Sequence, residues 1–149
     1  MELRTHSLTF KTRGHTDIVD ITPQVSEVLA SSGLVEGAAA LFVIGSTAAV
    51  TTIEYEPGLV ETDVKEMFER IAPYEKEYAH NGTWGDDNGA AHLRASLLGS
   101  SLTVPFGDGR LLLGTWQQVV VVDFDTRPRR RSVVLQLQGL VRADAPRGA

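Results

Sequence analysis

The chain of 149 residues contains no cysteine. Its absence excludes disulfide bonds, thiolate zinc sites, iron–sulfur clusters and cysteine nucleophiles. Long apolar runs are also missing: the longest strongly apolar run covers residues 119–122, whereas a membrane helix needs about 20 residues. The first residues show no basic region followed by an apolar stretch, as a secretory signal would. We therefore expect a cytoplasmic protein that does not enter a membrane.

An excess of positive charge is lacking as well. The chain has 14 Lys and Arg against 19 Asp and Glu, a net charge of −5, which does not favour nucleic acid or anionic membranes as partners. One arginine-rich segment, residues 127–131, resembles a nucleic-acid patch in isolation. Because it joins two predicted strands in an acidic chain, we favour a solvated hairpin tip.

The remaining composition is that of an ordinary globular domain. Hydrophobic residues make up 42% and charged residues 22% of the chain, and its length fits one domain. We expect this domain to span residues 1–141. Residues 142–149 are small, polar or Pro/Gly-bearing, and we expect them to form a flexible tail.

Strand patterns dominate the sequence. β-branched and aromatic residues with alternation or short apolar runs predict strands at residues 3–10, 18–21, 39–44, 47–55, 102–106, 110–113, 116–124 and 133–138. Gly45 separates two of these strands, and the 107–109 segment Gly-Asp-Gly is a hairpin signal. The four consecutive valines at 119–122 favour a strand buried on both faces.

Helix patterns are fewer. Thr22 and Pro23 predict an N-cap and first turn, with Gly33 as the stop. Apolar spacing predicts a second helix over residues 60–71, and a short third helix covers residues 90–98. The sum is an α+β protein, a mainly antiparallel β-sandwich with two or three flanking helices.

Residues 74–89 form a long polar segment that concentrates unusual side chains. Loops of this length inside compact domains are often functional. His80, Asp86 and Asp87 lie in it, and His92 follows in the next helix. Imidazole with carboxylate suits a divalent metal such as zinc. The alternative is that residues 86–88 cap the next helix and that His92 packs.

Three further groups have both a chemical and a structural interpretation. Ser100 and Ser101 next to Arg94 resemble a phosphate cradle, or simply a helix stop before a strand. Glu56 and its neighbour Glu54 can supply paired carboxylates, or solvated charges at a strand end. The 114–117 segment Gly-Thr-Trp-Gln interrupts a hairpin, where it either lines a cleft or packs.

Two segments of the sequence resemble a known protein family. Residues 80–105, which include Gly-Asp-Asp-Asn-Gly-Ala-Ala-His, and residues 108–118, which include Leu-Leu-Leu-Gly-Thr-Trp-Gln-Gln, closely resemble the YjbQ-like family, also called secondary thiamine-phosphate synthase enzymes. The segment 46–54 fits an earlier motif of that family. Many members carry His where this chain has Gly45 and Ala90, so a three-imidazole metal site is incomplete here.

The resemblance implies a β-sandwich that assembles as a homotrimer or higher homo-oligomer, and a pocket for a small phosphorylated substrate. It implies a weak thiamine-phosphate synthase activity, which joins a pyrimidine methyl diphosphate to a thiazole phosphate and releases pyrophosphate. A metal-dependent hydrolase and a non-enzymatic binder of a metal or metabolite stay as alternatives. A divalent metal, zinc or magnesium, is the expected cofactor.

Site residues follow from the same reasoning. The expected catalytic residues are His80, His92 and Glu56. The expected substrate-binding residues are Trp84, Arg94, Ser100, Ser101, Thr115, Trp116 and Gln117. The expected metal ligands are His80, Asp86, Asp87 and His92. These assignments require that the imidazoles of residues 80 and 92 meet in one cavity, with residues 115–117 as its floor.

Overall fold

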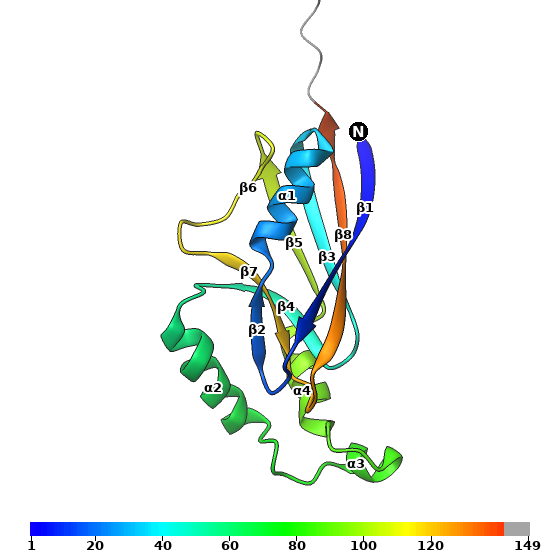
Figure 1. Cartoon of the computed structure of the whole chain (residues 1–149), viewed down its shortest axis with the longest axis vertical. Coiled ribbons are helices and arrows are strands. Elements are labelled where there is room, and N and C mark those ends of the chain that lie inside the picture. Colours follow the sequence, from blue (N-terminus) through cyan, green and yellow to red (C-terminus); the bar gives the residue numbers. More distant parts are fainter. Residues whose placement is uncertain (142–149) are drawn as a thin grey trace, which may run out of the picture.

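Two antiparallel sheets pack face to face in the computed structural model, which describes residues 1–141 (Figure 1). The larger sheet contains, in spatial order, β1 (Glu2–Thr12), β8 (Arg129–Val141), β3 (Leu34–Ile44), β5 (Ser101–Gly107) and β6 (Arg110–Leu111). The smaller sheet contains β2 (Asp17–Asp20), β7 (Gln118–Asp123) and β4 (Ala48–Ile53). The α+β sandwich expected from the sequence is therefore confirmed, while the expected tail lies outside the described residues.

Alternation along the strands builds the core between the sheets. In β8, Val133, Leu135 and Leu137 are fully buried, and the residues between them face outward. Leu135 lies opposite Leu41 of β3, so the inward residues of neighbouring strands meet in register. Burial of such side chains contributes about 1.5–3 kcal/mol each, which makes this register strongly preferred over a one-residue slip.

The smaller sheet is covered on both faces. All four valines of residues 119–122 in β7 are buried, as the sequence predicts. One face joins the core between the sheets, and the other packs against Phe68 of α2 (Val64–Ile71) and Ala91 and Ala95 of α4 (Gly89–Leu98). A π-helical segment, η1 (Gly58–Asp63), precedes α2.

Helix boundaries differ from the predictions in three places. α1 (Thr22–Ser32) begins at Thr22, one residue before the predicted start, and ends at Gly33 with φ 72° as expected. The expected single helix over 60–71 is split into η1 and α2. The segment 74–89, expected to be loop, contains α3 (Ala79–Trp84), which projects from the lower end of the molecule in Figure 1.

Residues 45–47, which we call the crossover turn, carry the chain from β3 in the larger sheet to β4 in the smaller one. Gly45 adopts φ 140°, a conformation that favours glycine. The predicted break at Gly45 is therefore confirmed, and it is the point at which one sheet passes into the other.

The outer face of the larger sheet, which we call the open face, has no helix over it within the described residues. Its members alternate with the core residues: Leu3, Thr5, Ser7, Thr9, Glu36, Ala38, Ala40, Phe42, Ile44, Ser101, Thr103, Pro105, Ser132, Val134, Gln136, Gln138 and Leu140. Phe42 is 48% exposed on this face. Its charged side chains lie at its ends, Glu36 with Arg110 at one and Lys11 with Arg130 at the other.

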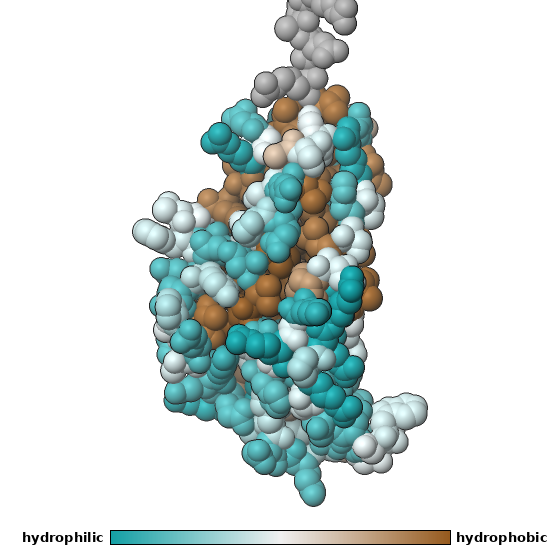
Figure 2. All heavy atoms as spheres, viewed as in Figure 1, coloured by the Kyte–Doolittle hydropathy of each residue, from teal (hydrophilic) through white to brown (hydrophobic). Residues whose placement is uncertain are grey.

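Hydrophobic and hydrophilic surfaces separate along the long axis. Figure 2 shows hydrophobic residues gathered around α1 and the upper strands, while the lower end around α2 and α3 is mainly hydrophilic. Within residues 1–141, no helix has the length and apolar character needed to cross a membrane.

Candidate functional site

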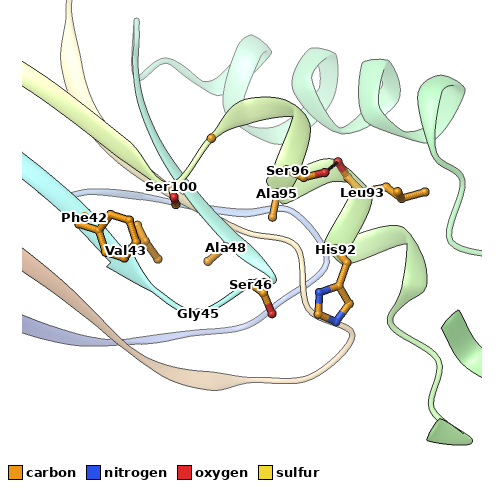
Figure 3. A pocket seen from close by; sticks show the side chains of 11 residues that line it. Phe42, Val43, Gly45, Ser46, Ala48, His92, Leu93, Ala95, Ser96 and Ser100 are labelled. Atoms are coloured by element: carbon orange, nitrogen blue, oxygen red, sulfur yellow. Dashed lines mark hydrogen bonds between the residues drawn. The ribbon is translucent and has the colours of Figure 1, made fainter. Parts of the chain in front are cut away.

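A pocket of about 740 Å³ opens where the crossover turn faces α4 (Figure 3). Its position follows from two backbone hydrogen bonds, Val43 N–H to Ser100 O at 2.9 Å and Val50 N–H to Gly99 O at 3.1 Å, which hold the α4–β5 turn against β3 and β4. The pocket is lined by Phe42, Val43, Gly45, Ser46, Ala48, His92, Leu93, Ala95, Ser96, Gly99 and Ser100. Mostly apolar walls with a few polar groups are typical of small-molecule sites.

His92 lies at one end of this pocket, and His80 lies beside it. The two imidazole ring centroids are 4.4 Å apart with an interplanar angle of 58°. His92 projects from α4 and His80 from α3, so the packing of these two helices brings the rings together. The expected meeting of the two imidazoles agrees with the structure, and their catalytic role stays a prediction.

The surroundings of His80 hold its ring in place. With its nitrogen toward them, the Asn88 side-chain amide donates to Asp86 Oδ2 and to His80 Nε2, each at 3.2 Å. His80 Nε2 lies 3.6 Å from Asp86 Oδ2. Asn81 Oδ1 accepts the Gly89 N–H at 3.0 Å, and a Cβ on Gly89 would lie 2.6 Å from Tyr78 Cβ. Glycine at residue 89 therefore allows α3 and α4 to approach closely.

The predicted metal ligands do not form a metal site. Asp87 turns away from the imidazoles, accepts a 2.7 Å hydrogen bond from Thr126 Oγ1 and lies 3.6 Å from Arg127 Nη2. The Thr126 hydrogen bond and the Arg127 charge lower the pKa of Asp87. Within residues 1–141, no group of three or more His, Asp or Glu side chains is arranged to hold a metal. The described residues of a single chain therefore present no three-ligand group for zinc or magnesium, and the metal ligands stay a prediction. The predicted helix cap is absent too, because Asn88 makes no side-chain cap hydrogen bond to α4.

Arg94 does not line this pocket. Its side chain is 1% exposed and points toward α2, where Nε donates to Ala72 O at 2.8 Å, Nη1 to Thr16 Oγ1 at 3.0 Å and Nη2 to Glu69 Oε2 at 2.6 Å. The guanidinium also stacks 3.8 Å above the Tyr74 ring centroid. Burial raises the pKa of Tyr74 above its ordinary value. Arg94 therefore ties α4 to the rest of the chain, and its three nitrogens are already engaged.

The other predicted binding residues divide between the pocket and the surface. Ser100 lines the pocket, whereas Ser101 is exposed on the open face opposite Phe42. Trp84 is 77% exposed at the end of α3.

Residues 115–117 and Glu56 lie at the far end of the β4–β7 strand pair. The pocket adjoins Ala48, which pairs with Asp123, whereas Gln118 pairs with Ile53 five residues along the strand. At about 3.3 Å per residue, the two ends are about 17 Å apart. The expectation that residues 115–117 form the pocket floor is therefore wrong for a single chain.

At that far end, polar side chains form hydrogen bonds with nearby backbone groups and with the adjoining strand. Gln117 Oε1 accepts the Gly114 N–H at 3.0 Å, and Gln117 Nε2 donates to Thr52 Oγ1 at 2.8 Å. Glu56 accepts the N–H groups of Gly58 and Leu59 at 2.8 and 2.6 Å, at the start of η1. Trp116 is 71% exposed.

A buried charge network, which the sequence reasoning missed, supports the crossover turn. Arg131 donates to Asp123 from Nε at 2.7 Å and from Nη2 at 2.6 Å, and Nη2 also donates to Thr47 at 2.7 Å. Asp125 accepts from Thr47 and from Arg129, each at 2.9 Å. Thr12 adds a hydrogen bond to Asp123.

Residues 127–130 of the arginine-rich segment are exposed, as the predicted solvated tip requires, and the network corrects that interpretation at Arg131 alone. Asp123 is fully buried and Arg131 is nearly so. Burial alone would raise the pKa of Asp125, but the hydrogen bonds from Arg129 and Thr47 outweigh it and lower that pKa. The signal in the sequence is the pair Asp123 and Asp125, which precedes Arg131 and Arg129 by eight and four residues and faces them across the turn that links β7 of the smaller sheet to β8 of the larger one.

Comparisons with known proteins agree along nearly the whole chain. The sequence profile described as UPF0047 protein YjbQ-like matches residues 6–140. A UPF0047 protein of Archaeoglobus fulgidus is 40% identical over 129 residues, covering 87% of this chain and 97% of that protein. UPF0047 protein YugU of Bacillus subtilis is 33% identical over 133 residues, covering 89% of this chain and 98% of that protein. The crystal structure of a hypothetical protein, APE1520, from Aeropyrum pernix aligns with a TM-score of 0.85 at 36% identity, over 92% of this chain and 99% of that one.

Proposed function

Since the chain belongs to the YjbQ-like UPF0047 family, we propose that it is an enzyme acting on a small phosphorylated substrate held in the pocket between the crossover turn and α4. The observation that carries the proposal is that His92 lines the pocket and lies 4.4 Å from His80. Imidazole is the side chain best suited to exchanging protons near neutral pH. A pair of imidazoles at a pocket wall supports acid–base chemistry there.

The reaction we propose to test is the weak formation of thiamine phosphate. In this reaction the thiazole nitrogen forms a bond to the methylene carbon of the pyrimidine. The bond from that carbon to the pyrophosphate oxygen breaks, and pyrophosphate leaves with the electron pair. His92 would donate a proton to the leaving oxygen, and His80, held by Asn88, would orient His92.

The pocket suits such a pair of substrates in size and character. A volume of about 740 Å³ lies within the range of about 300–1,000 Å³ that small-molecule sites occupy. Apolar side chains on one wall can pack against a heterocycle, while hydroxyls of Ser46, Ser96 and Ser100 line the same pocket. A metal-dependent hydrolase is less favoured, because the described residues of a single chain present no three-ligand group for a metal.

The experiment is a product assay on the purified full chain. Incubation with the pyrimidine diphosphate and the thiazole phosphate should give thiamine phosphate by mass spectrometry, and His92→Ala should lower the rate by at least about 100-fold. His15→Ala, an exposed histidine away from the pocket, is the matched control and should keep the rate. Absence of product with the unmodified chain would contradict the reaction, and binding of either precursor without turnover would favour a binding protein.

Our proposal includes the homotrimer and the cytoplasmic location expected from the sequence. The open face supports an assembly of identical chains, because its centre is neutral in a chain with net charge −5, and interface cores are depleted in charge. Phe42 belongs both to this face and to the pocket lining. A second copy seated on the open face would therefore cover one side of the pocket.

A further inference from the structure

Arg131 has one guanidinium nitrogen that its network leaves without a partner. Nε and Nη2 bond to Asp123 and Thr47, whereas no acceptor among the described residues hydrogen-bonds to Nη1. The side chain is only 8% exposed. Nη1 itself keeps access to solvent, since His6 Nε2 is the one buried side-chain nitrogen or oxygen without a partner among the described residues. Nη1 can therefore donate to a ligand that enters from outside the chain.

Nη1 is aimed at the crossover turn. A Cβ placed on Gly45 would lie 2.9 Å from Nη1, so the nitrogen stands where any side chain at residue 45 would begin. Gly45 and Ser46 both line the pocket. Figure 3 shows Gly45, Ser46 and His92 at the same end of the pocket, with Phe42 at the other end. The glycine therefore leaves the buried guanidinium open toward the pocket.

The charge around Nη1 permits an anion. The carboxylates of Asp123 and Asp125 are matched by the guanidiniums of Arg131 and Arg129, so the network itself is neutral. Lys11 and Arg130 pair across β1 and β8 at the same end of the sheet. They lie on the open face at this end of the sheet, and neither forms an ion pair with any residue from 1 to 141.

Further donors surround the position. Within residues 1–141, the backbone N–H groups of residues 45–47 donate to no backbone acceptor, and no side chain accepts from them. Backbone N–H groups beside an arginine fork are a common arrangement for oxyanions. The Ser46 hydroxyl also lines this end of the pocket.

We propose that Arg131 Nη1, with Ser46 and the N–H groups of the crossover turn, binds the phosphate group of the substrate, and that Gly45 is the residue that makes this contact possible. The inference rests on the proposed function, because it assigns a phosphate subsite to the same pocket. It places the phosphate at the end of the pocket next to His92 and the rest of the substrate toward Phe42.

The test titrates the full chain with inorganic phosphate at constant ionic strength, and follows backbone amide signals of residues 45–47 and the Arg131 side-chain signals by ¹⁵N NMR. We expect saturable shifts confined to these groups and to His92. Gly45→Ala, which places a methyl group over Nη1, should weaken phosphate binding by at least about tenfold, and Ser46→Ala by a smaller factor.

Gly33→Ala is the matched control, since Gly33 also has a positive φ of 72° but a Cβ there meets nothing within 4 Å. This variant also places a side chain on a backbone with positive φ, and it should bind phosphate as the unmodified chain does. Equal weakening in both variants, or shifts that sodium chloride reproduces, would overturn the subsite. Phosphate binding that Gly45→Ala removes, without any thiamine phosphate formed, would keep the subsite and reject only the proposed reaction.

Discussion

At one end of the β4–β7 strand pair, polar side chains from three strands form a buried network beside a pocket. At the other end, polar side chains bond to nearby backbone and to the adjoining strand. The first end, where Ala48 pairs with Asp123, has a buried ion network beneath it and an imidazole pair beside it. The second end, where Gln118 pairs with Ile53, has Glu56 bonded within its own turn and Gln117 bonded both to its own turn and to Thr52 of β4. Residue types alone do not separate these cases, because both ends are rich in polar groups. What separates them is the buried ion network and the imidazole pair, both of which lie at the first end.

The largest expected effect is on stability. Arg131→Met would leave the fully buried Asp123 without its partner, and we expect the free energy of unfolding to fall by about 3–5 kcal/mol. Gln117→Ala at the second end, where the side chain is exposed, should cost less than about 0.5 kcal/mol. Urea denaturation of both variants measures the contrast. Equal losses would mean that the two ends do not differ in this way.

The next largest expected effect is on catalytic activity, which should differ between variants at the two ends of the strand pair. In the product assay described above, His92→Ala should reduce the rate at least about 100-fold, whereas Trp116→Ala should change it less than threefold, because Trp116 is exposed and about 17 Å of strand separates its end from the pocket. A large loss of rate in Trp116→Ala would contradict the proposed difference between the two ends of the strand pair. It would indicate that residues 115–117 of another copy reach the pocket.

The oligomeric state decides whether residues 115–117 of another copy can reach the pocket. Ala40→Lys places a charge at the neutral centre of the open face, and we expect the mass in solution to drop from three chains to one of 16.2 kDa. Light scattering coupled to size-exclusion chromatography measures this. Thr9→Lys, at the margin of the same face, is the control and should remain assembled. A chain that is already monomeric before substitution would contradict the proposed trimer.

The smallest expected effect is on the pH dependence of stability. The pKa of Asp125 is lower in the folded chain than its ordinary value of 3.8. The unfolded chain therefore binds this proton more readily, so the stabilisation is present above pH 3.8 and is lost as the pH falls through the folded value. Arg129→Gln removes a partner of Asp125 and should flatten this loss. Urea denaturation between pH 2 and 5 (a range of about 2 units around the carboxyl value) compares the slopes, and identical slopes would contradict the assignment.

Most of the fold could be predicted from the sequence, because the strands have local signals. Alternation in residues 133–137 and the valines of residues 119–122 predict one-sided and two-sided burial, and both are observed. α3 was missed because Asn81 and Gly82 weaken its helical pattern and none of its residues is buried. The ends of β1, β3 and β8 extend beyond the predictions, since pairing with a neighbouring strand recruits polar residues such as Arg129, whereas β4, β6 and β7 are shorter than predicted.

The candidate site could be predicted only in part. His80 and His92 were identified because they lie close in sequence, in two helices joined by a short segment. The pocket wall around Gly45 was not, because it depends on how the two sheets connect. Arg131 was assigned to solvent because arginine runs are usually exposed, whereas its carboxylate partner Asp123 lies on the preceding strand. Such pairing between strands of two different sheets is a property of the topology rather than of local residue pattern.

The crossover turn has a practical consequence for identifying the natural ligand. Because the turn links the two sheets, a molecule retained there must leave before the sandwich can come apart. Ligand binding at the crossover turn therefore raises the melting temperature, and the rise grows with the logarithm of the ratio of ligand concentration to dissociation constant. A thermal-shift screen of phosphorylated metabolites can be run in parallel on the unmodified chain and on Gly45→Ala. Compounds that bind at the crossover turn should stabilise only the unmodified chain, whereas compounds that bind elsewhere should stabilise both.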